Sequence, residues 1–238
     1  MEVWEAALDL PASVLCRLAV LLTEEETARA RRFHFEHDRR HFTAARGLLR
    51  LLLGRYLGAD PAVLRFGYGP RGKPHVTVPA DTALRFNLSH SHGHALFAFA
   101  WGREIGVDLE AGARLGEDWP GIARRVFSPR EQAELFGLPS GHQRDAFLNG
   151  WTRKEAFLKA TGQGLVDGLQ SIEVTLDPTR PPLLLSAGAV GPAERWSVLD
   201  LRRAGGVAAA LVVEGPPCLV VRLDYRTVFA ELPAAIDP

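Results

Sequence analysis

Cysteine is scarce in this sequence, which excludes a cysteine-rich architecture. Only Cys16 and Cys218 occur among 238 residues, and they have neither metal-motif spacing nor the density of a disulfide framework. We therefore predict a reducing compartment, the cytoplasm. The opening stretch MEVWEAALDL contains acidic residues and no basic region, so a secretory signal is not expected there.

Long hydrophobic runs and an excess of one charge are also missing. The longest apolar stretch, LLRLLLGRYL at 48–57, is interrupted by Arg50 and Arg55 and is too short to span a bilayer. Lys and Arg number 28 together, as do Asp and Glu, so the formal net charge is zero. A general polyanion binder depends on excess positive charge. We expect neither nucleic acid nor a membrane as a partner, and any recognition through charge must be local.

The common motifs of nucleotide-binding and hydrolytic enzymes are missing or out of context. The sequence contains no Walker A motif, which disfavours P-loop kinases. Its one G-x-G-x-x-G spacing, GYGPRG at 67–72, leads into the tight turn RGKP and does not open a predicted helix, which disfavours Rossmann enzymes. It also lacks G-x-S-x-G, so nothing marks an esterase nucleophile elbow.

Two similar runs of helix and strand indicate an α+β fold with two subdomains. Thr23 with Glu26, and Ser128 with Glu131, have the spacing of capping boxes, each opening a helix. Long helices are predicted from about 38 to 57 and from about 142 to 161, and a short helical turn from 60. Strands are predicted at 3–10, 64–69, 86–91, 94–101, 104–110, 171–176, 195–201, 207–213 and 218–224. We expect subdomains at 1–110 and 111–238, each a small antiparallel sheet packed with helices, with loops at 177–192, 215–217 and 233–238.

Acidic residues alternate in the segment IGVDLE at 105–110. In a strand, Gly106, Asp108 and Glu110 would share one face, opposite Ile105, Val107 and Leu109. In the helix that contains WTRKEAFLK at 151–159, one stripe carries Trp151, Glu155 and Lys159. If that stripe faces the strand, three carboxylates and an ammonium meet, a ligand set that suits Mg²⁺.

A plainer interpretation of the same residues is available. A D-x-E pair on a strand can be a solvated face, and Glu155 with Lys159 can be an ordinary helix ion pair worth about 0.3–0.5 kcal/mol. We expect Trp151 to support the core beside the stripe.

Several segments carry groups that suit a phosphate. Ser89 and His90, in FNLSHS, are donors at a strand end, and Lys73 lies in the tight turn RGKP. The helical stretch from 29 to 50 offers candidate anion contacts at Arg29, Arg46 and Arg50. Two histidine groups at 34, 37, 41 and 90, 92, 94 suggest zinc, but neither has the context that zinc motifs require.

Taken in order, the segments RGKP, FNLSHS, IGVDLE, FSPREQAEL and WTRKEAFLK resemble the surfactin-type 4′-phosphopantetheinyl transferases, over about residues 29–165. The resemblance implies a two-lobed, pseudo-twofold α+β monomer with the active site and coenzyme A site between the lobes. It also implies transfer of phosphopantetheine from coenzyme A to a serine of an acyl, peptidyl or aryl carrier protein, with release of 3′,5′-ADP.

The resemblance assigns roles to residues singled out above. It implies that Asp108, Glu110 and Glu155 bind Mg²⁺ and that Glu155 is the base toward the carrier serine, directly or through water. Further implied contacts are Lys159 and His90 with the coenzyme A phosphates, Lys73 and Ser89 with the nucleotide, and Arg29 near the 3′-phosphate. Glu26 stands where some relatives have a second cation, so Arg39, Arg40 or Arg46 could replace it.

Two other functions compete with carrier modification. One is Mg²⁺-dependent hydrolysis of a pyrophosphate-containing metabolite, which would use the same carboxylates. The other is an inactive carrier-binding module, which the three carboxylates disfavour because clustered negative charge is costly without a function.

Overall fold

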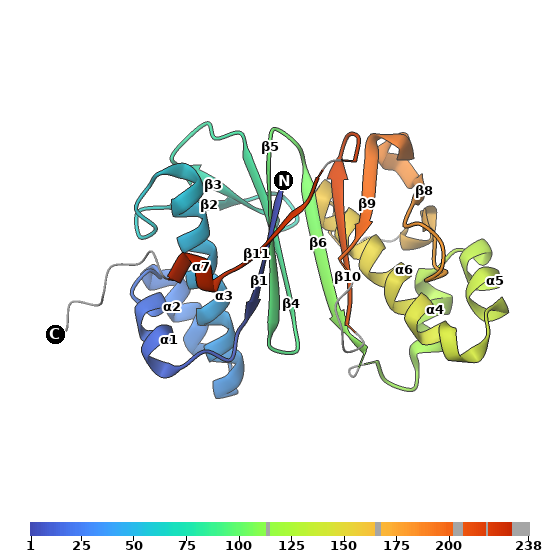
Figure 1. Cartoon of the computed structure of the whole chain (residues 1–238), viewed down its shortest axis with the longest axis horizontal. Helices are drawn as coiled ribbons and strands as arrows, with labels where there is room; N and C mark the ends of the chain where they lie inside the picture. The colour runs from blue at the N-terminus through green and yellow to red at the C-terminus, as the bar shows by residue number, and fades with distance from the viewer. Residues whose placement is uncertain (113–114, 165–167, 202–206, 218, 230–238) are drawn as a thin grey trace.

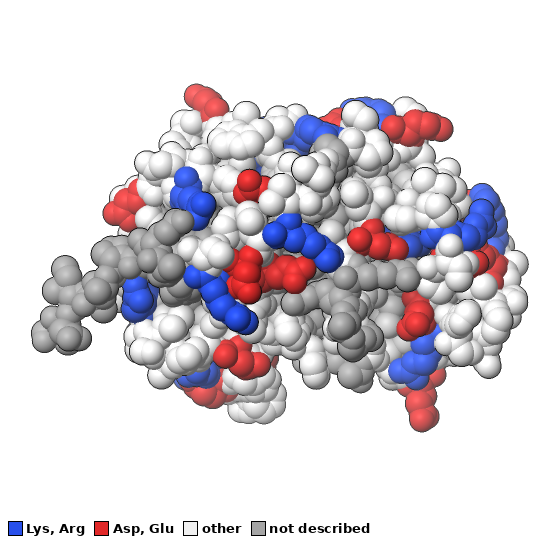
Figure 2. Space-filling view, in the orientation of Figure 1, with Lys and Arg blue, Asp and Glu red and all other residues white. Residues whose placement is uncertain are grey.

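The computed structural model describes residues 1–112, 115–164, 168–201, 207–217 and 219–229. Cys218 and the predicted loop at 233–238 lie outside them. Two sheets stand face to face, with helices on the outer side of each, so the molecule has four layers (Figure 1). On the face shown in Figure 2, acidic and basic side chains are intermingled, in keeping with the zero net charge. Among the described helices, none is long and apolar enough to cross a membrane.

The chain builds the same order of elements twice. The first half contains β1 Glu2–Ala7, α1 Ala12–Ala19, α2 Glu24–Arg31, α3 Glu36–Leu57, β2 Arg65–Tyr68, β3 Pro74–Val78, β4 Leu84–Ser91 and β5 His94–Trp101. The second half contains β6 Ile105–Ala111, α4 Trp119–Val126, α5 Pro129–Gly137, α6 Ser140–Thr161, β7 Ile172–Val174, β8 Leu184–Ala187, β9 Trp196–Asp200 and β10 Val207–Glu214. Strand β11 Val221–Asp224 and helix α7 Arg226–Phe229 follow.

Strand pairing follows the same duplication. The first sheet has the order β11-β1-β5-β4 and the second has the order β6-β10-β9, while β2-β3 and β7-β8 form separate hairpins. Strand β1 pairs with β5 as β6 pairs with β10, and all these ladders are antiparallel. The exception is β11, which returns to the first sheet and lies parallel to β1. The expected α+β fold with pseudo-twofold symmetry is confirmed.

A buried ion pair at equivalent positions also relates the halves. Both predicted capping boxes form, and the glutamate of each box turns inward to a cation on the following long helix. Glu26 accepts from Arg50 at 2.7 Å, and Glu131 accepts from Lys154 at 2.6 Å. The long helices α3 and α6 each have 22 residues.

The division expected after residue 110 separates β6 from its own sheet. Because β6 has the place in the second half that β1 has in the first, we propose a boundary at the turn Gly102-Arg103.

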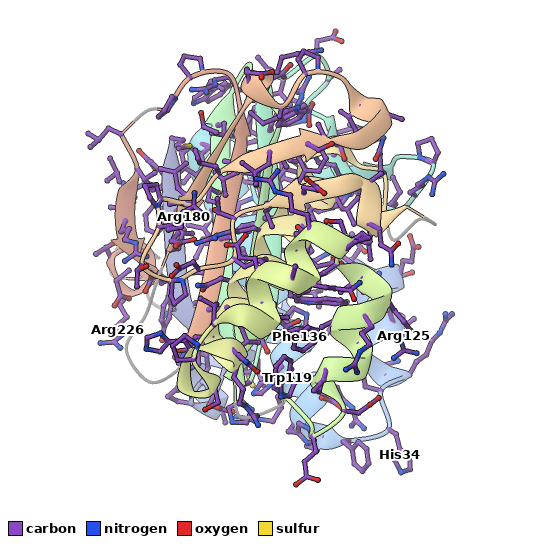
Figure 3. All side chains as sticks on the ribbon, turned by 90° about the vertical axis from the view of Figure 1, so that its right-hand side faces the viewer. His34, Trp119, Arg125, Phe136, Arg180 and Arg226 are labelled. Carbon is purple, nitrogen blue, oxygen red and sulfur yellow. The ribbon has the colours of Figure 1, made fainter. Side chains whose placement is uncertain are left out.

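Three apolar layers hold these elements together. Val3, Leu96 and Ala98 of the first sheet pack against Val107 and Leu211 of the second, which forms the core between the sheets. The opposite face of the first sheet packs on α1 and α3, and the opposite face of the second sheet packs on α6. In the second half, Trp119 of α4 stacks on Phe136 of α5 with ring centroids 6.2 Å apart (Figure 3).

Some sequence predictions need correction. The stretch after Asp60 is a turn rather than a helix, and α1, α4, β3 and β8 were not predicted. Helices α1 and α4 have no side-chain cap, and β3 and β8 are short strands that exist only as partners of β2 and β7.

Candidate active site

Strand β6 lies directly against α6 because residue 106 is a glycine. A Cβ atom on Gly106 would come within 2.1 Å of the Ala156 carbonyl oxygen and 2.3 Å of the Ala160 nitrogen, so only glycine permits this approach. Ile105, Val107 and Leu109 face the other sheet. The predicted alternation is therefore confirmed, and it directs Asp108 and Glu110 toward the helix that carries Glu155 and Lys159.

Asp108 is buried in a cluster of polar contacts between β4, β6 and α6. Its side chain is 5% exposed, and its Oδ1 accepts hydrogen bonds from Lys159 Nζ at 2.6 Å and Ser89 Oγ at 2.9 Å. The lysine also donates to Ser89 Oγ at 3.0 Å. The ammonium predicted from the helix stripe thus meets the carboxylate predicted from the strand.

Glu110 has two donors of its own. Ser91 Oγ donates to Glu110 Oε2 at 3.2 Å, and the Trp151 indole N–H also donates to this carboxylate. Burial, followed by the charge of Asp108, raises the pKa of Glu110, while these two donors oppose the rise. Trp151 therefore contacts the acidic cluster directly, in addition to stacking on Phe147 as expected of core support.

The pKa of Glu155 is strongly raised. Burial raises its pKa to about 7, the charge of Asp108 adds to the rise, Lys159 lowers it, and Glu110 raises it further. A carboxyl group with this pKa is close to half ionised at neutral pH. It is therefore able both to accept and to release a proton under physiological conditions.

The donor set fits a hard cation in kind, although the carboxylates do not converge on one point. Across the described residues, no three His, Cys, Asp or Glu side chains are gathered closely enough to hold a metal ion as they stand. However, Asp108 Oδ2 and Glu155 Oε1 are buried with no hydrogen-bond partner. Buried carboxylate oxygens without a hydrogen-bond partner are what a bound Mg²⁺ would satisfy.

A pocket of about 230 Å³ opens beside this cluster. Its lining combines Glu155 and Lys159 with the turn that contains Arg71 and Lys73 and with the end of α6 at Gly162. Lys73 donates to Glu104 Oε2 at 2.7 Å and to the Ala160 carbonyl at 2.6 Å, and burial lowers its pKa. Lys73 thus joins the two halves and also forms part of the pocket wall. Arg71 was not singled out from the sequence, because a turn arginine carries no distinctive signal.

A second pocket, of about 480 Å³, lies farther along β4. The exposed His90 lines it together with His37, His41, His92 and Asp9. Because Leu88 lines the first pocket and His90 the second, consecutive parts of one strand serve both. Within the described residues, none of these histidines belongs to a group that could hold a metal ion.

The three predicted arginines have different surroundings. Arg29 lies over the ring of Phe42 and lines a recess of about 90 Å³ between α2 and α3. Arg46 is paired with Glu26 at 2.6 Å. Arg50 is 1% exposed and donates to Glu26 and to the carbonyls of Pro61 and Leu64, which disfavours it as a contact for coenzyme A, although it lines the same recess.

Comparisons with known proteins identify the family of this chain. The model described as 4′-phosphopantetheinyl transferase, N-terminal, matches residues 11–100, and that of the 4′-phosphopantetheinyl transferase superfamily matches residues 104–212. The 4′-phosphopantetheinyl transferase HetI of Nostoc sp. is 44% identical over 216 residues, which are 90% of this chain and 88% of the relative. This chain belongs to the 4′-phosphopantetheinyl transferase family. The family resemblance and the expected enzyme class are confirmed.

Other relatives within the 4′-phosphopantetheinyl transferases are more distant. Sfp of Bacillus subtilis is 31% identical over 160 residues, which are 67% of this chain and 69% of the relative. Among solved structures, the holo-[acyl-carrier-protein] synthase of Thermotoga maritima is 25% identical, with a TM-score of 0.39 over 48% of this chain and 64% of its own.

The contact between Trp151 and Glu110 can be tested without removing the ring. Trp151→Phe deletes the indole N–H and keeps the stacking on Phe147, so we expect a loss of about 1 kcal/mol or less in the free energy of unfolding and a several-fold lower transfer rate. Urea denaturation and a transfer assay would measure both. An unchanged rate would show that Trp151 serves packing alone.

Proposed function

We propose that this enzyme uses Mg²⁺ to transfer the 4′-phosphopantetheine arm of coenzyme A to a serine of an acyl, peptidyl or aryl carrier protein. The products are the holo-carrier and 3′,5′-ADP. The observation that carries the proposal is the position of Glu155 and Lys159 in the wall of a pocket, next to the buried Asp108, in a chain of this family. The surfactin-type subgroup is part of the proposal.

Asp108, Glu110 and Glu155 would hold the Mg²⁺ ion. When bound, the ion would supply positive charge to the pyrophosphate of coenzyme A, as in phosphoryl-transfer sites generally. The unpartnered Asp108 Oδ2 and Glu155 Oε1 support this assignment, because the cluster as it stands leaves negative charge unsatisfied. Ser89, Ser91 and Trp151 orient Asp108 and Glu110 by donating to them.

Glu155 is the proposed base toward the carrier serine. A pKa of about 7 makes its carboxylate a better proton acceptor than an ordinary exposed glutamate. Without a cation, the acceptor form is populated as the pH rises through 7. A bound cation lowers this pKa, and proton transfer through a water molecule is then the alternative route.

Lys159 is the proposed partner of the phosphate charge that grows on the leaving 3′,5′-ADP. An ammonium group has three N–H donors, and Asp108 and Ser89 each accept one from Lys159. The third would serve a ligand in the pocket that Lys159 lines. With 29% of the side chain exposed, Lys159 combines a fixed position with access to a ligand.

The remaining contacts with coenzyme A are assigned from the pockets. We propose that Lys73 and Ser89 lie near the nucleotide of coenzyme A and that His90 contacts one of its phosphates. Arg29, together with Arg46, would lie near the 3′-phosphate. Arg46 is the weaker candidate because Glu26 already offsets its charge. One chain provides β4 from the first half and β6 with α6 from the second. We therefore propose that the site lies between the two subdomains and that the enzyme acts as a monomer. We also propose that it acts in the cytoplasm.

A labelling experiment tests the proposed transfer. The protein would be incubated with coenzyme A, Mg²⁺ and a panel of acyl, peptidyl and aryl carrier proteins, and each carrier would be weighed by mass spectrometry. We expect a gain equal to one phosphopantetheine on the carrier and loss of labelling when EDTA removes the metal. Release of 3′,5′-ADP without a gain in carrier mass would instead indicate the hydrolase, and neither product would indicate a carrier-binding module.

A further inference from the structure

Strand β6 lies at the edge of its sheet, and side chains rather than a neighbouring strand occupy its outer side. One side of β6 pairs with β10. On the other side, Lys73 Nζ donates to the Ile105 carbonyl at 3.3 Å, and the Val107 N–H donates to Asn87 Oδ1 at 2.9 Å. Asn87 is 5% exposed and Val107 is fully buried, so water does not replace this bond at low cost.

Four alternate residues of β4 make side-chain contacts with β6 or with Glu104, the residue before it. We name them the β4–β6 seam: Arg85 with Glu104, Asn87 with the Val107 N–H, Ser89 with Asp108, and Ser91 with Glu110. The seam connects the edges of two sheets that share no ladder. Two of its four contacts end on carboxylates of the candidate active site.

Within the seam, Asn87 differs from the two serines. A serine hydroxyl rotates about its Cα–Cβ bond and holds one carboxylate at a time. The Asn87 contact reaches the backbone of β6 one residue before Asp108, so it fixes the strand itself. Movement of the strand there would displace Asp108 and Glu110 together relative to Glu155.

We propose that Asn87 is a positioning residue for the metal ligands. Its amide oxygen holds the edge of β6 through the Val107 N–H, and so fixes the strand from which Asp108 and Glu110 would approach a divalent cation shared with Glu155. This inference rests on the proposed function, because it presupposes that these carboxylates bind a metal. It adds a residue that acts on the metal ligands through the backbone of β6, and whose side chain also lines the pocket beside Glu155 and Lys159.

Three variants test the role of Asn87. Asn87→Ala removes the acceptor, and Asn87→Asp keeps an oxygen at the same place. Asn149→Ala, which truncates another buried asparagine, on α6, is the matched control. The primary readout is binding of Mn²⁺ alone, followed by the electron paramagnetic resonance signal of the free ion at a temperature below every unfolding midpoint. The second is the Mg²⁺ concentration that gives half-maximal carrier labelling, compared with the KM for coenzyme A.

We expect Asn87→Ala to raise the Mn²⁺ dissociation constant about tenfold, within the range for residues that orient metal ligands, and to change the KM for coenzyme A by a smaller factor. Asn87→Asp should restore most of the affinity, and Asn149→Ala should bind Mn²⁺ like the unaltered protein. If Asn87→Ala does not fold, Asn87→Ser takes its place, since its hydroxyl is too short to reach Val107.

Two failures are distinguishable. Affinity for Mn²⁺ that is unchanged in Asn87→Ala, or lowered equally in Asn149→Ala, would overturn the positioning role and leave the proposed function intact. Absence of Mn²⁺ binding to the unaltered protein would overturn the metal assignment and, with it, this inference.

Discussion

Glu155→Gln should lower the rate of carrier labelling by a factor of about 10² to 10⁴ while making the metal-free protein more stable at pH 8. The rate falls because the substitution removes a proton acceptor whose contribution is of this size, together with one charge of the proposed metal site. Asp108→Ala should reduce labelling comparably.

The gain in stability follows from the raised pKa of Glu155. Burial raises that pKa from 4.5 to about 7, so the folded protein holds a proton that the unfolded chain releases between these values. The stabilisation from the protonated form is complete below pH 4.5 and is lost as the pH rises through 7. Glutamine stays neutral and avoids this loss, which is worth at most about 3 kcal/mol.

Thermal unfolding in EDTA at pH 5 and pH 8 would measure this difference. The gain from Glu155→Gln should be small at pH 5 and clearly larger at pH 8, and Mg²⁺ should raise the midpoint of the unaltered protein more than that of the variant. Glu194→Gln, at an exposed glutamate far along the chain, is the control and should change nothing. Near-normal labelling by both Glu155→Gln and Asp108→Ala would contradict the active site described above.

Lys154→Met should destabilise the protein by about 3–5 kcal/mol. Lys154 and Glu131 are each 1% exposed, and Lys154 also donates to the carbonyls of Val126 and Leu169. Burial lowers the pKa of the lysine and raises that of the glutamate, so each depends on the other to remain charged. Removal of one partner leaves an uncompensated buried charge, which accounts for the size of the effect.

Urea denaturation of Lys154→Met, Glu131→Leu and the double variant would measure the coupling between the two residues. The double variant should be less destabilised than the sum of the single variants, because no charge is left alone. It should not regain full stability, since Glu131 also accepts from the Ser128 and Val174 N–H groups. Additive losses would show that the two charges are not coupled.

Local features of the fold were predictable, and tertiary pairings were not. The capping boxes, the left-handed ends at Gly58 and Gly162 and the alternation in β6 each depend on residues a few positions apart. Strands β3 and β8 depend on partners that a propensity pattern does not reveal.

The same distinction between local features and tertiary pairings applies to the site residues. The faces of β6 and α6 indicated which side chains would meet, but not that Lys159 would bond to Asp108. Arg50 looked like an anion contact because its partner, Glu26, is 24 positions away in the sequence and the pairing arises only when α2 packs on α3.

The return of β11 to β1 has a consequence for synthesis on the ribosome. The first sheet begins with residues 2–7, yet its outermost strand is made of residues 221–224. While the second half is being translated, the β1 edge therefore lacks its parallel neighbour and presents unpaired backbone groups, a state in which strands recruit other chains. The first sheet is complete only when residues 221–224 have been synthesised, long after residues 2–7. The two lobes are therefore not independent folding units despite their symmetry.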